Sequence, residues 1–202
     1  MFQLIPFPIV CVLLQLSSTQ LTSASSLVNF SKAEDFWTIL GVVPVLIDAA
    51  PPEILIVEYE GGLTVDGGNE LTPAQVQNKP VKIQWSFQDG DLFTLCLVDP
   101  DAPSSTLPLL REFQHWIVVN IPGNEFLKGE ALAVYLGSQP PPLSGLHRYT
   151  FLVYKQPMYL TCDEDRLRNP NLKGRGKFSI RKFAAKYKLG EPVAGNVFRA
   201  RG

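Results

Sequence analysis

The two histidines of the chain, His115 and His147, each stand where a polar segment meets an apolar, strand-like run. Asp99 and Asp101 stand at a third such junction, directly after the apolar run Leu92–Val98. Either carboxylate can accept the N–H of an imidazole and so orient the other ring nitrogen toward a ligand. Protonated histidine and backbone N–H groups donate well to phosphate or carboxylate oxygens. These four side chains predict a small anion-binding pocket, provided that the fold brings the three junctions together.

Prolines stiffen the segments around these side chains. Pro100 and Pro103 follow the apolar run, and the segment 138–144 contains three consecutive prolines. Proline lowers the conformational entropy that a loop loses on folding, so the pocket is expected to be preformed. The proline-rich segment is expected to form a second stiff wall.

Structural interpretations compete with this one. An Asp-Pro-Asp segment alone is often a capped turn, and a single histidine in a strand is often structural. Arg111 and Arg148 are candidate partners of the two aspartates, as an alternative to contacting a ligand. The joint occurrence of all three polar segments favours a binding site.

The elements that must position these residues are mainly strands. Seventeen prolines and 15 glycines favour turns and extended segments over a helical bundle. Alternating or continuous apolar runs predict strands at 54–60, 81–87, 92–98, 113–121, 147–155 and 194–199. Helices are predicted at 31–40, which begins with the capping box Ser31–Glu34, and at 179–189, and one or two helical turns are predicted at Glu130–Leu136.

The first 24 residues differ from the rest of the chain. Residues 1–20 carry no charged side chain and are mostly apolar, and small residues precede a plausible cleavage point after Ala24. This pattern predicts a secretory signal peptide at 1–24, a domain at 25–202 and an extracellular protein, although a buried N-terminal strand is the alternative. Asn29 opens an N-glycosylation sequon. Cys96 and Cys162 are expected to be separate thiols, because Cys96 lies inside an apolar strand.

The balance of charged residues excludes nucleic acid as an expected partner. The chain has 18 basic and 19 acidic residues, so it lacks the basic excess that nucleic-acid binding requires. Nine of the basic residues and none of the acidic ones lie in the span Arg166–Lys188. We expect either a solvated basic face or a surface that steers the protein to anionic membranes.

Three segments together resemble the signatures of the phosphatidylethanolamine-binding protein family, also called Raf kinase inhibitor proteins. They are Asp99–Ser104, Arg111–His115 and Gly145–Tyr149, and the resemblance extends over roughly 36–198. It implies a mostly β fold in which a large, mainly antiparallel sheet packs on a smaller one, with short peripheral helices. It also implies a pocket for the phosphate-bearing headgroup of a lipid such as phosphatidylethanolamine, or for another small anionic or amphipathic ligand.

Carried over by matching positions, the resemblance implies a specific set of ligand-binding residues. The core of the site is Asp99, His115 and His147, surrounded by Asp101, Pro103, Gly137, Pro140 and Tyr149. Gln139 stands where many members have glycine, which narrows or re-lines the mouth of the pocket. Many animal members also have a C-terminal helix beside the pocket, and this chain is expected to lack it and to have a more open pocket.

Other functions remain as alternatives. An inhibitor that binds a protease or a kinase through the loops at the pocket rim is the second candidate. The chain has no Gly-x-Ser-x-Gly motif and no reactive-cysteine context, so neither catalysis nor a cofactor is expected. Asp99 and the two histidines have the residue types of a metal triad, but an obligatory metal is not expected.

Overall fold

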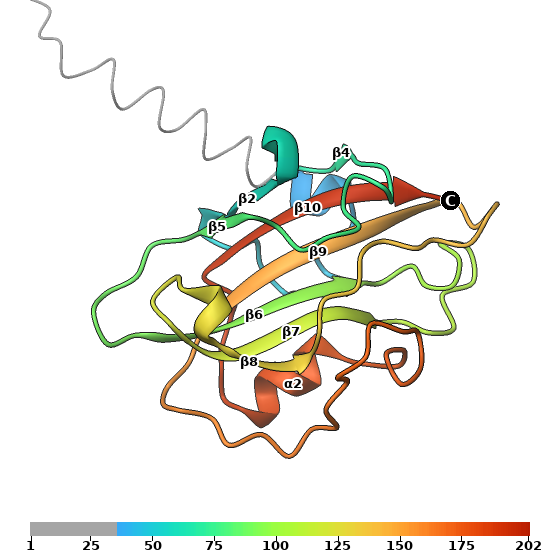
Figure 1. Ribbon diagram of the computed structural model, residues 1–202. Helices are drawn as coiled ribbons and strands as arrows, with labels where there is room; N and C mark the ends of the chain where they lie inside the picture. Colours follow the sequence, from blue (N-terminus) through green and yellow to red (C-terminus); the bar gives the residue numbers. More distant parts are fainter. Residues whose placement is uncertain (1–35) are drawn as a thin grey trace, which may run out of the picture. The chain divides into compact units, whose positions relative to one another are not determined.

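Two β-sheets form the framework of the part of the protein that the computed structural model describes, residues 36–202 (Figure 1). The seven-stranded sheet has the order β1-β10-β9-β6-β7-β8, with β4 also beside β10, and the three-stranded sheet has the order β3-β2-β5. The only parallel pairings in the described sheets are those of β1 and β4 with β10. The predicted large, mainly antiparallel sheet with a smaller partner is therefore confirmed. The strands are β1 (Glu53–Ile54), β2 (Ile56–Tyr59), β3 (Leu63–Thr64), β4 (Asn69–Glu70), β5 (Lys82–Gln84), β6 (Leu92–Asp99), β7 (Phe113–Pro122), β8 (Glu130–Ala133), β9 (Leu146–Lys155) and β10 (Ala194–Arg201).

Strand β6 is buried on both faces, as its continuous apolar sequence predicts. Successive side chains of a strand point to opposite faces. Phe93, Leu95 and Leu97 join the core that includes side chains of the small sheet. Cys96 and Val98 join a second core on the opposite face of the large sheet. From Phe93 onward the strand is buried, and its polar residues are the terminal Asp99 and Thr94, whose hydroxyl donates to the Gln156 side chain.

Helix α2 (Ile180–Lys186) covers the second face of the large sheet. The Ser179 side chain accepts a hydrogen bond from the Lys182 N–H and caps the helix. Ile180 and Phe183 are buried against the sheet. Residues 36–39 are also helical, and Trp37 packs into the same core. Two 3₁₀ turns, η1 (Glu60–Gly62) and η2 (Phe126–Lys128), complete the helical content of the described residues.

The prediction of helical turns at Glu130–Leu136 is wrong. Residues Glu130–Ala133 form β8, which pairs antiparallel with β7 at the edge of the sheet. Alanine favours helices locally, but the segment instead satisfies backbone groups of β7 and buries Leu132 and Ala133. Tertiary pairing therefore overrides the local preference.

Two predicted strands also differ in extent. The strand expected at 81–87 is restricted to β5. The one expected at 54–60 is divided between β1 and β2, because the Leu55 N–H donates to the Gly195 carbonyl of the large sheet while Ile56 pairs in the small one. The segment thus connects the two sheets.

Several sequence predictions lie outside the described residues. These are the signal peptide, the sequon at Asn29 and the capping box at Ser31–Glu34. Among residues 36–202, no helix is long and apolar enough to cross a membrane. Cys96 and Cys162 are separate thiols, as expected.

Candidate functional site

The three polar junctions of the sequence meet at one end of the large sheet. Asp99 is the last residue of β6, Phe113 is the first residue of β7 and Leu146 is the first residue of β9. Because β6 pairs antiparallel with both β7 and β9, the end of β6 lies beside the beginnings of its two neighbours. This topology gathers Asp99, His115 and His147 from three separate parts of the sequence.

A β-bulge places His115 on the correct face of the sheet. In the β6–β7 ladder Leu97 pairs with Trp116, whereas Val98 pairs with Gln114, so His115 is the additional residue. With regular alternation, His115 would share a face with Ile117, which packs in the core beneath α2. The bulge changes this parity, and His115 instead lines the same cavity as Asp99.

Asp99 and His147 form the polar base of the site. The Asp99 Oδ2 atom accepts a hydrogen bond from His147 Nδ1 at 2.8 Å, and Oδ1 accepts the Asp101 N–H at 2.7 Å. His147 Nε2 lies 2.9 Å from Ser144 Oγ. Because an ionised carboxylate only accepts, Nδ1 carries a hydrogen and the ring orientation is fixed.

The second histidine is held by a backbone carbonyl. His115 Nδ1 donates to the Leu136 carbonyl at 2.8 Å, which leaves Nε2 as the ring nitrogen with a free lone pair in the neutral form. Burial lowers the pKa of His115 below its ordinary value, and the charge of Asp99 opposes this shift only in part. The neutral form therefore prevails at neutral pH, and an anion that enters the cavity favours protonation.

Asp101 is directed away from the cavity and toward Arg148. Its carboxylate accepts hydrogen bonds from the Arg148 Nε and Nη2 atoms at 2.8 and 2.6 Å and from the Arg148 backbone N–H at 2.9 Å. Arg148 Nη1 also donates to the carbonyls of Leu40 and Gly41. Of the two interpretations of this arginine, the geometry matches that of a structural partner of Asp101.

A cavity of about 140 Å³ lies over these groups. Six of the eight predicted ligand-binding residues line it: Asp99, Pro103, His115, Pro140, His147 and Tyr149. Asp101 lies outside its lining, and Gly137 lines a neighbouring groove of about 660 Å³ instead. Gln139 borders both the cavity and the groove. Their roles in binding a ligand remain predictions.

Apart from Gln139, the cavity is lined around this polar base by apolar side chains. Ala102, Leu110, Phe113, Pro141 and Leu172 complete its lining. The alternation between Phe113 and His115 could have indicated the position of Phe113, whereas no sequence pattern indicates Leu172, which comes from the loop that precedes α2. A polar base under an apolar mouth suits a ligand with one charged end and one apolar end.

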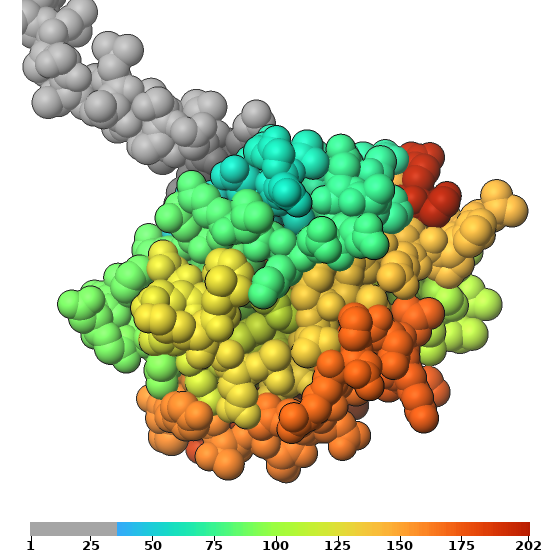
Figure 2. Space-filling view, in the orientation of Figure 1, coloured from blue at the N-terminus to red at the C-terminus, as the bar shows by residue number. Residues whose placement is uncertain are grey.

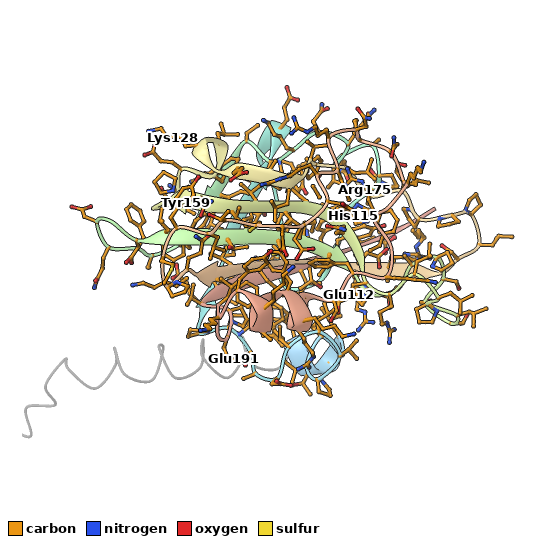
Figure 3. All side chains as sticks on the ribbon, turned by 90° about the horizontal axis from the view of Figure 1, so that it is seen from below. Glu112, His115, Lys128, Tyr159, Arg175 and Glu191 are labelled. Carbon is orange, nitrogen blue, oxygen red and sulfur yellow. The ribbon has the colours of Figure 1, made fainter. Side chains whose placement is uncertain are left out.

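Arg175 is a further residue that sequence analysis did not single out. It is wholly buried and donates to the carbonyls of Asn171, Gln114, His115, Val134 and Asn169 at 2.7–3.1 Å. In Figure 3 it lies next to His115. No carboxylate of the described residues pairs with it, so it is a buried cation that ties β7 to the loop carrying Leu172.

The residues of the site are not arranged as a set of metal ligands. Within residues 36–202, no group of three histidine, cysteine or carboxylate side chains is arranged to hold a metal ion. Both nitrogens of His147 are already engaged, by Asp99 and by Ser144.

Comparisons with known proteins agree with this architecture. Residues 61–198 match the family model described as phosphatidylethanolamine-binding protein. Odorant-binding protein A5 of Drosophila melanogaster is 36% identical over 160 residues, which cover 79% of this chain and 76% of that protein. A 26 kDa secreted antigen of Toxocara canis is 39% identical over 162 residues, and the match covers 79% of this chain and 61% of the antigen. The structure of a carboxypeptidase Y inhibitor, solved with its cognate proteinase, superposes with a TM-score of 0.70 at 30% identity and covers 85% of this chain and 95% of the inhibitor.

The two sheets and the cavity at the ends of β6, β7 and β9 define a β-rich binding protein. The chain belongs to the phosphatidylethanolamine-binding protein family.

Proposed function

We propose that this protein is a secreted binding protein whose cavity takes a phosphate-bearing headgroup, such as that of phosphatidylethanolamine, or another small amphipathic ligand. The observation that carries the proposal is the convergence of Asp99, His115 and His147 at the base of a cavity with an apolar mouth. A protonated His115 would donate to a phosphate oxygen, and the Asp99 carboxylate would attract an ammonium group. The apolar mouth would accommodate the portion of the ligand next to the headgroup.

Paired substitutions at His115 test this function. His115→Asn keeps an amide N–H near the position of Nδ1, so the contact with the Leu136 carbonyl can persist while the nitrogen that faces the ligand is lost. We expect this variant to fold normally and to lose binding of glycerophosphoethanolamine in titration calorimetry. Gln75→Asn, an exposed substitution, is the matched control. Equal binding by His115→Asn and wild type would contradict the proposal.

Export forms part of the proposal and has its own test. A relative described as a secreted antigen supports an extracellular location. We expect mass spectrometry of the protein from the culture medium of expressing cells to show a mature chain that begins at Ser25. A chain that retains residues 1–24 inside the cell would contradict export.

A second candidate function is inhibition of a protease through the loops at the cavity rim. It is favoured by the 30% identity to the carboxypeptidase Y inhibitor. If it is correct, substitutions in the loop at 104–109 will abolish inhibition of carboxypeptidase Y, whereas His115→Asn will leave inhibition intact. Inhibition that is lost in His115→Asn and retained in the loop variants, or no inhibition by the wild type, would contradict this second candidate.

A further inference from the structure

Three loops form a continuous rim around the mouth of the cavity. They are residues 102–111, 137–146 and 168–177, and each contributes to the cavity lining. The first two are joined by the hydrogen bond from the Ser105 N–H to the Ser144 carbonyl at 3.2 Å. The first and third are joined by the bond from the Lys177 N–H to the Leu110 carbonyl at 3.0 Å. In Figure 1 these loops gather at the same end of the large sheet as the C-terminus of β10.

Exposed leucines stand on all three loops. The exposed fractions are 59% for Leu107, 65% for Leu109, 102% for Leu143 and 58% for Leu172. Leu143 also has a φ of 63°, a left-handed conformation that is unfavourable for leucine. These side chains contribute little to the packed cores, so their apolar surface is available to a partner. Figure 2 shows the loop that contains residues 137–146 projecting from the surface of the described unit.

Two of these loops, 102–111 and 168–177, carry positive charge, and the loop 137–146 has no charged residue. The three loops together contain five basic residues and no acidic ones: Arg111, Arg168, Arg175, Lys173 and Lys177. All of these except Arg175 are exposed. Among residues 36–202, Arg168, Lys173 and Lys177 take part in no ion pair, and Arg111 approaches only Asp101, at 3.9 Å. The rim therefore combines exposed leucine side chains with basic residues, most of which have no carboxylate partner.

The remainder of the basic span is different. On α2, Arg181 pairs with Asp48, and Lys186 pairs with Asp163 and Glu164. Arg166 pairs with Glu130. Three of the five basic residues outside 168–177 are therefore paired. Among the described residues Lys182 and Lys188 also lack an ion pair, but they lie on or directly after α2, which does not contribute to the cavity lining.

The opposite end of the sheet provides a natural contrast. It also has exposed apolar side chains, Leu127, Met158 and Tyr159, and Figure 3 shows Tyr159 on the far side from His115. Its charges are mixed, because Lys128 pairs with Glu125 and Lys155 pairs with Asp91. Of these two ends of the sheet, the rim is the one where exposed apolar side chains and a single sign of charge coincide among the described residues.

We propose that this rim docks on the surface of an anionic lipid bilayer. The leucines would enter the interfacial region while Arg168, Lys173 and Lys177 face lipid phosphates. The mouth of the cavity would then open directly onto the headgroups, so that a headgroup enters without first crossing water. This inference rests on the proposed headgroup-binding function for its purpose, but the docking itself is measured independently of the cavity.

Vesicle co-sedimentation tests the docking. The wild-type protein should bind vesicles of phosphatidylcholine mixed with phosphatidylserine, and should bind phosphatidylcholine vesicles weakly. Added salt should weaken the binding, because it screens exposed charges. The triple variant Leu107→Gln, Leu109→Gln, Leu143→Gln should bind roughly tenfold or more weakly, since each leucine contributes apolar surface to the interface. Lys173→Glu combined with Lys177→Glu should reduce the binding to a similar extent.

Matched variants serve as controls. Leu127→Gln, Met158→Gln and Tyr159→Gln together remove the same number of exposed apolar side chains from the other end of the sheet, and Lys182→Glu combined with Lys188→Glu reverses two exposed charges near α2. Both should bind vesicles as wild type does. The inference would be overturned if the rim variants bind vesicles as well as the controls do. It would also be overturned if the wild type does not bind anionic vesicles.

Binding of soluble glycerophosphoethanolamine separates the two proposals. The rim variants should retain it, because none of their substituted residues lines the cavity. A wild-type protein that binds the soluble headgroup but not vesicles overturns the docking and leaves the proposed function standing. A wild-type protein that binds vesicles but not the soluble headgroup overturns the proposed function and leaves the docking standing. Loss of protease inhibition in the rim variants, with no vesicle binding by wild type, would make the rim an enzyme-contact surface and overturn lipid docking.

Discussion

Asp99 and His147 are joined by a 2.8 Å hydrogen bond between Oδ2 and Nδ1, although 48 positions separate them in the chain. The bond links the end of β6 to the beginning of β9, and both residues are almost fully buried. A buried carboxylate requires hydrogen-bond partners, and here the imidazole and the Asp101 N–H provide them. The pair thus stabilises the end of the sheet and supplies the negative charge at the base of the cavity.

Replacing Asp99 by asparagine should affect different ligands in opposite directions. The side-chain oxygen of the introduced asparagine can still accept the Asp101 N–H, but the negative charge is lost. We expect glycerophosphoethanolamine, which has an ammonium group, to bind about three- to tenfold more weakly, and inorganic phosphate to bind more tightly, since a nearby like charge is removed. Calorimetric titration of both ligands measures this. Equal changes for the two ligands would show that Asp99 does not contact the ammonium group.

Binding of a phosphodiester should strengthen as the pH falls. Burial holds the pKa of His115 below its ordinary value of 6.5, so the ring is neutral at neutral pH and is protonated only in acid. A bound anion raises this pKa, and the affinity therefore increases as the pH falls through the pKa of the bound state. Titrations with glycerophosphoethanolamine between about pH 8 and 5, in buffers with different ionisation enthalpies, should show proton uptake. The dependence of affinity on pH should disappear in His115→Gln. An affinity of the wild type that does not change with pH would contradict a role for His115.

Arg175→Lys should destabilise the folded protein and weaken the support of the site. Lysine cannot reach all five carbonyls that the guanidinium bridges, so buried acceptors lose their partners. We expect the free energy of unfolding to fall by about 2–4 kcal/mol. Ligand affinity should also fall under conditions where the variant is folded, because Leu172 and His115 are no longer held together. Urea denaturation and calorimetry provide the two measurements.

An exposed arginine provides the control for that substitution. Arg168→Lys should leave both stability and affinity close to wild type. If Arg175→Lys behaves in the same way as Arg168→Lys, the carbonyl contacts of Arg175 do not hold the site.

Glu112 should make the folded state less stable in base. Burial raises its pKa from 4.5 to about 7, despite the hydrogen bond that its carboxylate accepts from the Ile180 N–H. A raised pKa in the folded state means that the associated stability is complete below pH 4.5 and is lost as the pH rises through about 7. Glu112→Gln removes this titration, and the variant should be more stable than wild type at pH 8 by about 1–3 kcal/mol.

The comparison across pH makes the Glu112 prediction specific. Urea denaturation near pH 4 should give similar stabilities for Glu112→Gln and wild type, because the carboxyl group is protonated there. The exposed substitution Glu60→Gln should show no such pH-dependent gain. A constant difference between Glu112→Gln and wild type at both pH values would indicate a packing effect instead.

The sequence alone determined the β-rich class and the identity of the central strand. The continuous apolar run Leu92–Val98 requires burial on both faces, and that requirement holds whatever the topology. The three polar segments, through their types and order, indicated the site. Six of the eight site residues that the family resemblance implied line the cavity. Asp99, His115 and His147 were also indicated by the residues themselves, because a strand end next to a buried run is where polar groups reach the rim of a core.

The tertiary structure alone decided three further features. The bulge that turns His115 toward Asp99 depends on the register between β6 and β7, which no local sequence pattern specifies. The conversion of Glu130–Ala133 into a strand depends on the exposed edge of β7, whose backbone groups required partners. The role of Arg175 depends on carbonyls from separate segments of the chain. Each feature arises from contacts between residues distant in sequence, and local propensity has no information about such contacts.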